Sequence, residues 1–156
     1  RDVYKRQSFT DWLKKNVTDA RETLNNEITK FKSKELLEAV IAGCAMVAYA
    51  DGSVSGPEKQ KMMNYLKTSD QLKVFNQNDV IKLFQGYIEK FDFEVTIGTG
   101  EAMQAIGKFR GKPQGQLVVR VCCAIGAADG DFDEKEQAMV RRMCSELGLN
   151  PADFNL

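Results

Sequence analysis

Histidine is absent from this chain of 156 residues. Its absence excludes the Ser-His and Cys-His catalytic triads, the His-Glu zinc proteases and most structural zinc sites. An enzyme with this sequence would have to use carboxylates, lysines or thiols for its chemistry. We therefore expect a protein that is not an enzyme.

Three further features are missing. No apolar run approaches the roughly 18 residues that a membrane-spanning helix requires. The sequence shows no cleavable signal peptide, which favours a cytoplasmic location. Lysine plus arginine and aspartate plus glutamate each number 22, so no bulk positive field would draw the chain onto nucleic acid.

The four cysteines form no C-x-x-C pair and all lie within apolar helical patterns: Cys44, Cys122, Cys123 and Cys144. This placement is typical of small buried hydrophobic residues in a reducing compartment. A chemical role would require an exposed thiol with a low pKa. A thiol reagent at Cys122 and Cys123 is kept as a rival hypothesis.

The hydrophobic periodicity predicts an all-α fold of about seven helices. Residues 1–7 carry no apolar period, and we expect them to be a non-native or disordered leader. Residues 8–156 are expected to form one domain. The helices are expected to start at Ser8, Ser33, Ser55, Asn76 or Asn78, after Gly100, at Pro113 and at Asp133. Gly52 and Gly148 are expected to end the second and the seventh helix, and a short final turn is expected to pack Phe154 onto the core. The first, reaching Phe31, is amphipathic and mildly basic, so it would pack on its own domain or lie on an anionic membrane.

The segment from Phe91 to Ile97 alternates apolar and polar residues, which is a strand-like pattern. A single strand in a helical chain would leave its backbone groups unpaired. We therefore predict a turn that leads into a helix. The Gly98-x-Gly100 pair that follows continues into no phosphate-binding fingerprint, so it gives little support to a nucleotide site.

Two similar stretches, Ala50-Asp51-Gly52 and Ala128-Asp129-Gly130, suggest an internal repeat. In each, an acidic residue follows seven places after the aspartate, as Glu58 or Glu136. A shift of 78 positions aligns the two regions, about 40–66 and 118–144. The sequence thus predicts two pseudo-symmetric helix-turn-helix halves packed as one bundle, each with an acidic turn between its helices.

Helix capping explains part of this acidity. Ser55 stands three residues before Glu58, and Asp133 three before Glu136, which is the spacing of capping boxes. Capping leaves Asp51, Asp129 and Asp131 without a role. Oxygen-only clusters suit hard cations such as calcium, magnesium or manganese.

An EF-hand is the obvious competitor for the second turn, and its spacing fails. With Asp129 and Asp131 at the third and fifth loop positions, Phe132 stands where the glycine belongs. A cation at these turns would therefore lack a full protein cage. We expect weak, partly hydrated binding.

Several motifs in order resemble the TerB family of bacterial tellurite resistance proteins, and the resemblance covers residues 8–156. They are Asp51-Gly52 with Glu58-Lys59-Gln60-Lys61-Met62, Leu72-Lys73-Val74-Phe75, Phe91-Asp92-Phe93 with Ile97-Gly98-x-Gly100-Glu101, and Asp129-Gly130-x-Phe132-Asp133.

The resemblance implies a cytosolic, all-helical protein that binds a divalent cation and has no established catalytic activity. It also implies action in the stress response with other tellurium resistance proteins, including the membrane protein TerC, which leaves peripheral membrane association open. The acidic residues to which the resemblance assigns the metal site are Asp51, Glu58, Asp129, Asp131, Asp133 and Glu136. The Gly56-Pro57 pair departs from the family pattern, so that the first turn has only two carboxylates.

The leading hypothesis is a cation-responsive adaptor without enzymatic activity. The alternative is a metal-independent interaction module that uses the acidic turns as a docking surface.

Overall fold

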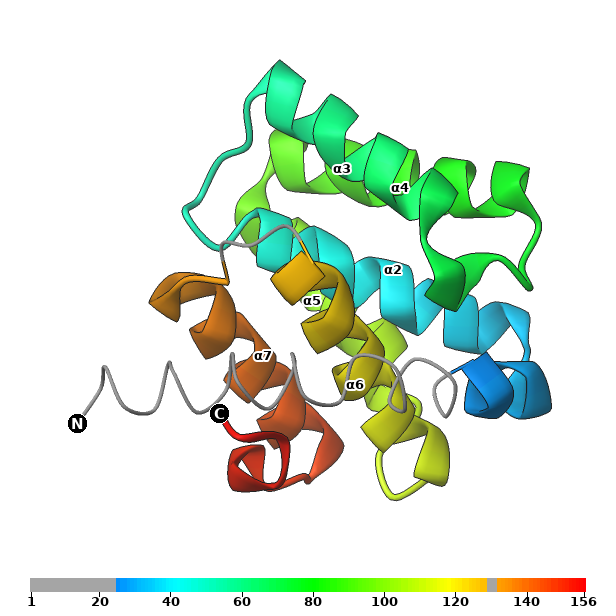
Figure 1. Cartoon of the computed structure of the whole chain (residues 1–156). Helices are drawn as coiled ribbons and strands as arrows, with labels where there is room; N and C mark the ends of the chain where they lie inside the picture. Colours follow the sequence, from blue (N-terminus) through cyan, green and yellow to red (C-terminus); the bar gives the residue numbers. More distant parts are fainter. Residues whose placement is uncertain (1–24, 129–131) are drawn as a thin grey trace.

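A computed structural model describes residues 25–128 and 132–156 as a bundle of helices (Figure 1). Residues 25–31 are helical, and no strand occurs in the described part of the chain. The all-α prediction is therefore confirmed. The elements that follow are α2 (Lys34–Ala48), α3 (Gly56–Thr68), α4 (Gln77–Phe93), α5 (Val95–Gly107), α6 (Pro113–Ala128) and α7 (Glu134–Leu147), with short 3-10 turns at Asp70–Leu72 and Pro151–Phe154.

Helix α2 forms the centre of the bundle. Every residue from Ala39 to Val47 is buried, and the helix packs against α4, α5, α6 and α7. Figure 1 shows α3 and α4 side by side on one side of α2, with α6 and α7 on the other. Small residues permit this crowding, because a Cβ at Gly43 would lie 2.6 Å from the Cys122 sulfur. A helix without a polar face has to be enclosed by its neighbours.

Most helix ends follow the local chemistry of the sequence. Side chains at the N-caps accept backbone hydrogen bonds at Ser33, Ser55, Asn76 and Asp133. Pro113 occupies the first position of α6, and Gly148 ends α7 in the left-handed conformation, with φ of 73°. Phe154 is buried in the final turn. These predicted boundaries are confirmed.

The end of α2 was predicted wrongly. Gly52 was expected to stop the helix, yet α2 ends at Ala48 with Tyr49 as its C-cap. The Tyr49 ring is buried and stacks on Phe91 of α4, with centroids 4.9 Å apart. This distant contact turns the chain earlier, and Gly52 takes its positive φ of 93° within the following turn.

The junction between α4 and α5 is helical on both sides, whereas the sequence predicted a turn over Phe91 to Ile97 and a helix that starts only after Gly100. Only Glu94 is extended, and its side chain caps α5 by accepting from the Thr96 amide at 3.4 Å. The apparent alternation arises because the end of one helix meets the start of the next.

The two acidic turns precede helices in the same register. Helix α3 begins at Gly56 and α7 at Glu134, a separation of 78 residues. Equal spacing of the helix starts does not show that the two halves have the same three-dimensional arrangement. The pseudo-symmetry therefore stays a prediction. The expected leader and the first helix up to residue 24 lie outside the described residues.

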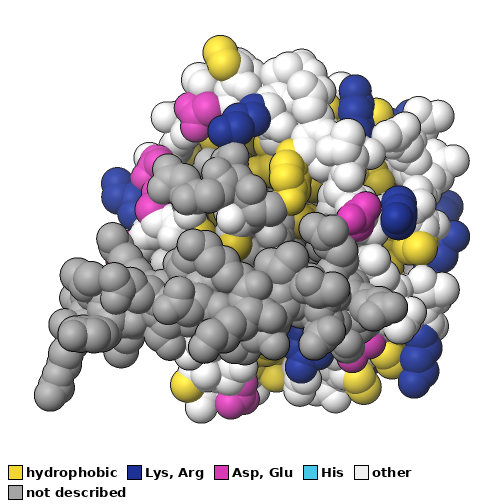
Figure 2. All heavy atoms as spheres, viewed as in Figure 1, with side chains coloured by type: hydrophobic (Ala, Val, Ile, Leu, Met, Phe, Trp, Pro, Cys, Tyr) yellow, Lys and Arg dark blue, Asp and Glu magenta, His cyan; other side chains and the backbone are white. Residues whose placement is uncertain are grey.

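The surface carries both charge signs. On the face in Figure 2, the coloured basic and acidic side chains are interspersed, and neither forms a continuous field. None of the described helices combines the length and apolar character needed to cross a bilayer.

Candidate functional site

The first acidic turn lies beside the start of α7. Asp51 has a side chain that is 61% exposed, and its Oδ1 atom lies 3.4 Å from the Lys135 Nζ atom. These residues are 84 positions apart in the sequence, so the fold brings the two predicted acidic regions together. Both groups are well hydrated, and an ion pair of this kind contributes little to stability.

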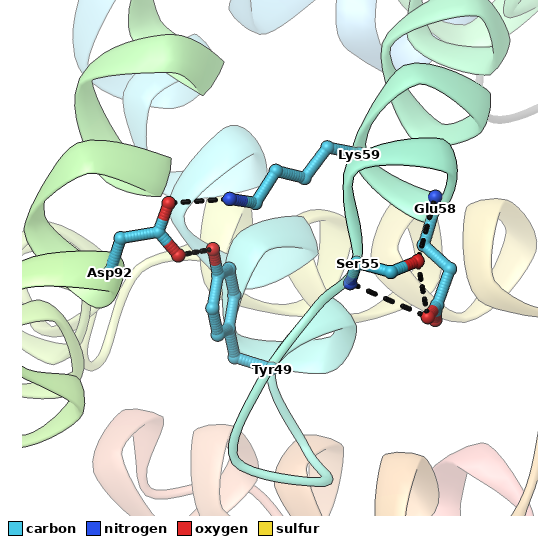
Figure 3. A network of polar contacts seen from close by, with 5 residues as sticks. All are labelled: Tyr49, Ser55, Glu58, Lys59 and Asp92. Carbon is cyan, nitrogen blue, oxygen red and sulfur yellow. Dashed lines mark hydrogen bonds and ion pairs between the residues drawn. The ribbon is translucent and has the colours of Figure 1, made fainter.

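Glu58 faces its own helix. The Glu58 amide donates to Ser55 Oγ at 3.3 Å, and the Ser55 hydroxyl donates to Glu58 Oε1 at 2.8 Å (Figure 3). The Ser55 amide also donates to that carboxylate, at 3.5 Å. This is the reciprocal capping box that the spacing predicts. Glu58 is therefore committed to starting α3.

Asp133 and Glu136 form the second capping box. The Glu136 amide donates to Asp133 Oδ1 at 2.8 Å, and the Asp133 amide donates to Glu136 Oε1 at 3.1 Å. The buried Gln137 side chain donates to the Phe132 carbonyl at 2.9 Å and holds the entry to α7. These carboxylates, like Glu58, have a structural role that does not require a ligand.

Only some of the predicted metal ligands are among the described residues. Asp129 and Asp131 lie outside the described residues. Within 25–128 and 132–156, no three Asp, Glu or Cys side chains gather closely enough to hold an ion. The structure thus places Asp51 near the start of α7, while Glu58, Asp133 and Glu136 cap helices.

A polar network behind the first turn was missed by the sequence reasoning. The Tyr49 hydroxyl donates to Asp92 Oδ1 at 2.5 Å, and Lys59 Nζ lies 2.5 Å from Asp92 Oδ2 (Figure 3). One carboxylate thereby joins the end of α2, the first half of α3 and the end of α4. The sequence signal was the Asp92 in Phe91-Asp92-Phe93, but its partners are 43 and 33 residues away.

The network shifts the acidity of its members. Lys59 lowers the pKa of Asp92 by donating to the carboxylate, and the Tyr49 hydroxyl adds to this effect. Burial raises the pKa of Tyr49, and its bond to Asp92 raises it further. The network therefore favours an ionised Asp92 beside a neutral Tyr49.

A surface hollow of about 320 Å³ adjoins this network. Its walls are formed by residues 52–54 of the first turn and by residues 91–95 at the junction of α4 and α5, with Tyr49 between them. The hollow thus lies next to the turn that carries Asp51.

Comparison with known proteins decides the family. The sequence pattern described as "Tellurite resistance protein TerB" matches residues 37–156. A "Tellurium resistance protein TerB" from an Alcaligenes species is 39% identical over 117 residues, covering 74% of this chain and 96% of that protein. The chain belongs to the TerB family of tellurite resistance proteins. No solved structure matches it.

The TerB match includes every element of the site. It begins within α2 and therefore covers both acidic turns, the Asp92 network and the hollow. The resemblance to the TerB family that the ordered motifs indicated is confirmed.

The four thiols of this TerB-family chain are buried and free, as predicted. The neighbouring Cys44 raises the pKa of Cys122, and burial raises it further. Burial also raises the pKa of Cys123. Burial, with a smaller effect from Asp153, raises the pKa of Cys144 to about 11. Thiols in this state are poor nucleophiles, which argues against a thiol reagent at Cys122 and Cys123.

Proposed function

We propose that this TerB-family protein is an adaptor without enzymatic activity that binds a divalent cation at its acidic turns. The contact between Asp51 and Lys135 carries the proposal, because it joins the first turn to the region of the second. Family membership supports a place in tellurite resistance.

The donor set fits a hard cation bound weakly. Asp51 is the described candidate that caps no helix, and its side chain is exposed to solvent. Its partner Lys135 is 71% exposed, so an arriving cation can replace the ammonium group at little cost. We propose Asp51, Asp129 and Asp131 as the ligands, with water completing the coordination.

A bound cation would supply positive charge where the turns are acidic. Glu58, Asp133 and Glu136, fixed in their capping boxes, hold the starts of α3 and α7 in place around it. The relative position of these two helix starts would then depend on the cation and present a surface to a partner. We propose other tellurium resistance proteins as partners, with the membrane protein TerC as one candidate, and the cytoplasm as the location.

Backbone amide shifts test the cation site. Titration with calcium, magnesium and manganese at millimolar concentration is expected to move the Gly52, Gly130 and Lys135 signals. Asp51→Asn is expected to weaken the response severalfold, because one charged ligand is lost. Asp79→Asn, an exposed carboxylate in the first turn of α4, is the matched control and should leave it unchanged. Unchanged Gly52 and Gly130 signals at millimolar cation would rule the site out.

A metal-independent docking module is the second candidate. It is favoured because Glu58, Asp133 and Glu136 already have a structural role in capping boxes, which needs no cation. In that case, replacing Asp129 and Asp131 by Asn weakens capture of a partner equally with and without chelator. If the Asn replacements weaken capture only when chelator is absent, and the wild-type chain itself captures little when chelator is present, the cation-dependent adaptor is favoured.

A further inference from the structure

Phe93 is an exposed aromatic residue at the end of α4. Its neighbours in the Phe91-Asp92-Phe93 motif have internal partners, because Phe91 stacks on Tyr49 and Asp92 binds Tyr49 and Lys59. Phe93 is instead 82% exposed. A single exposed hydrophobic residue is ordinary on a protein surface, so its surroundings decide whether it has a role.

The surroundings of Phe93 are concave and partly apolar. Phe93 lines the hollow of about 320 Å³, together with the half-buried side chains of Val54 and Val95. Ile97, in the same first turn of α5, is 46% exposed. Phenylalanine is enriched in protein interfaces, and the residues that contribute most to binding lie in pockets from which the partner excludes water.

The two charged residues that line the hollow are both acidic. Its wall contains the carboxylates of Asp92 and Glu94, and none of its described lining residues is a lysine or arginine. Asp51, next to the lining residue Gly52, is already paired with Lys135. Lys59 neutralises Asp92, but the exposed Glu94 carboxylate makes one long bond to Thr96 and keeps further acceptor capacity.

We propose that this hollow docks a segment of a partner protein that carries an apolar side chain next to a lysine or arginine. The apolar side chain would cover Phe93 and Val54, and the cation would reach Glu94. The complementary charge selects the orientation of the segment and speeds its association. This surface differs from the proposed cation site and does not require it.

Selection from a displayed library of random peptides, each about 12 residues long, tests the proposal on the full chain. The selection is run in chelator, so that a failure of the cation site leaves its outcome unaffected. Enriched peptides are expected to place Arg or Lys within two positions of Leu, Phe or Trp. A synthetic peptide of the most frequent sequence should shift the Phe93 and Val95 amide signals.

Three variants locate the binding. Phe93→Ser is expected to weaken the synthetic peptide about tenfold or more, as loss of a hot-spot aromatic does. Glu94→Gln keeps an acceptor for the Thr96 amide, and it should weaken binding severalfold and reduce the salt dependence. Asp79→Asn, at the opposite end of α4, should have no effect. Thermal unfolding of each variant separates lost binding from lost structure.

Three results would overturn the proposal. One is a selection that enriches acidic or uncharged peptides, and another is one that yields no peptide sensitive to Phe93→Ser. The third is sedimentation showing a dimer of the wild-type chain that Phe93→Ser converts to a monomer, because the occupant would then be a second copy of this chain.

Discussion

Gly98 has room for a hydrogen atom and for nothing larger. A Cβ at this position would lie 2.6 Å from Cγ of Phe91 and 2.9 Å from its Cα. The backbone of α4 therefore stands in the way, and rotation of the Phe91 side chain cannot relieve the contact. This close approach explains the glycine without a nucleotide ligand.

Replacing Gly98 by alanine is expected to lower the free energy of unfolding by about 1–3 kcal/mol, as overpacking of a core does. Gly100→Ala is the matched control in the same helix, because nothing lies within 4 Å of its added Cβ. That variant should gain up to about 1 kcal/mol from the better helix propensity of alanine. Urea unfolding curves measure both changes, and equal effects of the two variants would contradict the packing argument.

At the scale of single elements, the starts of α3 and α7 depend on the same device. Each helix has a reciprocal capping box, built from Ser55 and Glu58 or from Asp133 and Glu136. The acidic residues of these boxes stabilise the fold. A substitution that removes one can therefore weaken a cation response either by loss of structure or by loss of a ligand. Asparagine separates the two effects, because it caps helices about as well as aspartate without the charge.

Asp133→Ala is expected to cost about 1 kcal/mol of stability, and Asp133→Asn only a few tenths. The midpoint of thermal unfolding measures both. If Asp133 also binds the cation, Asp133→Asn will weaken the cation response while the unfolding midpoint stays near that of the wild-type chain. A large loss of stability in Asp133→Asn would show that its charge, and not its cap, stabilises α7.

The predictable parts of the fold are those decided by neighbours in the sequence. Ser55, Asp133 and Gly148 mark helix ends through hydrogen bonds and backbone angles within a few residues. The end of α2 was missed because Tyr49 stacks on Phe91, 42 residues later. The Asp92 network was missed for the same reason, since periodicity indicates which residues are buried and not which distant partners they meet.

In the candidate site, too, local contacts could be predicted from the sequence and distant contacts could not. The sequence predicted the capping role of Glu58 and Glu136, and each carboxylate accepts a hydrogen bond from the backbone amide of its N-cap residue, as expected. It could not predict that Lys135 would meet Asp51, because that contact depends on how α7 packs beside the first turn. Asp129 and Asp131 lie outside the described residues, and their role stays a prediction.

At the scale of the whole molecule, buried thiols and phenols link stability to pH. Burial, together with neighbouring groups, raises the pKa of Cys122 and Cys123 above the ordinary 9.0, and that of Tyr49 and Tyr87 above 10.0. A group whose pKa is higher in the folded state contributes its full stability below the unfolded pKa. That contribution is lost as the pH rises from the unfolded towards the folded pKa, because only the unfolded chain releases the proton.

The free energy of unfolding is therefore expected to be level between pH 7 and 8 and to fall progressively above about pH 9. Urea unfolding at half-unit steps up to pH 10.5, under reducing conditions, measures the decline. Tyr49→Phe serves as the comparison, since it removes one phenol and should make the decline above pH 10 shallower. A stability that rises over this range would contradict the assigned shifts.

The burial of residues 39–47 of α2 has a consequence for how relatives of this chain can diverge. Its residues from Ala39 to Val47 touch helices drawn from most of the sequence. Interiors packed this closely transmit a change of even one methylene group to their surroundings. Evolution at these positions must therefore proceed through matched replacements, in which volume gained on the central helix is given up by the helices around it.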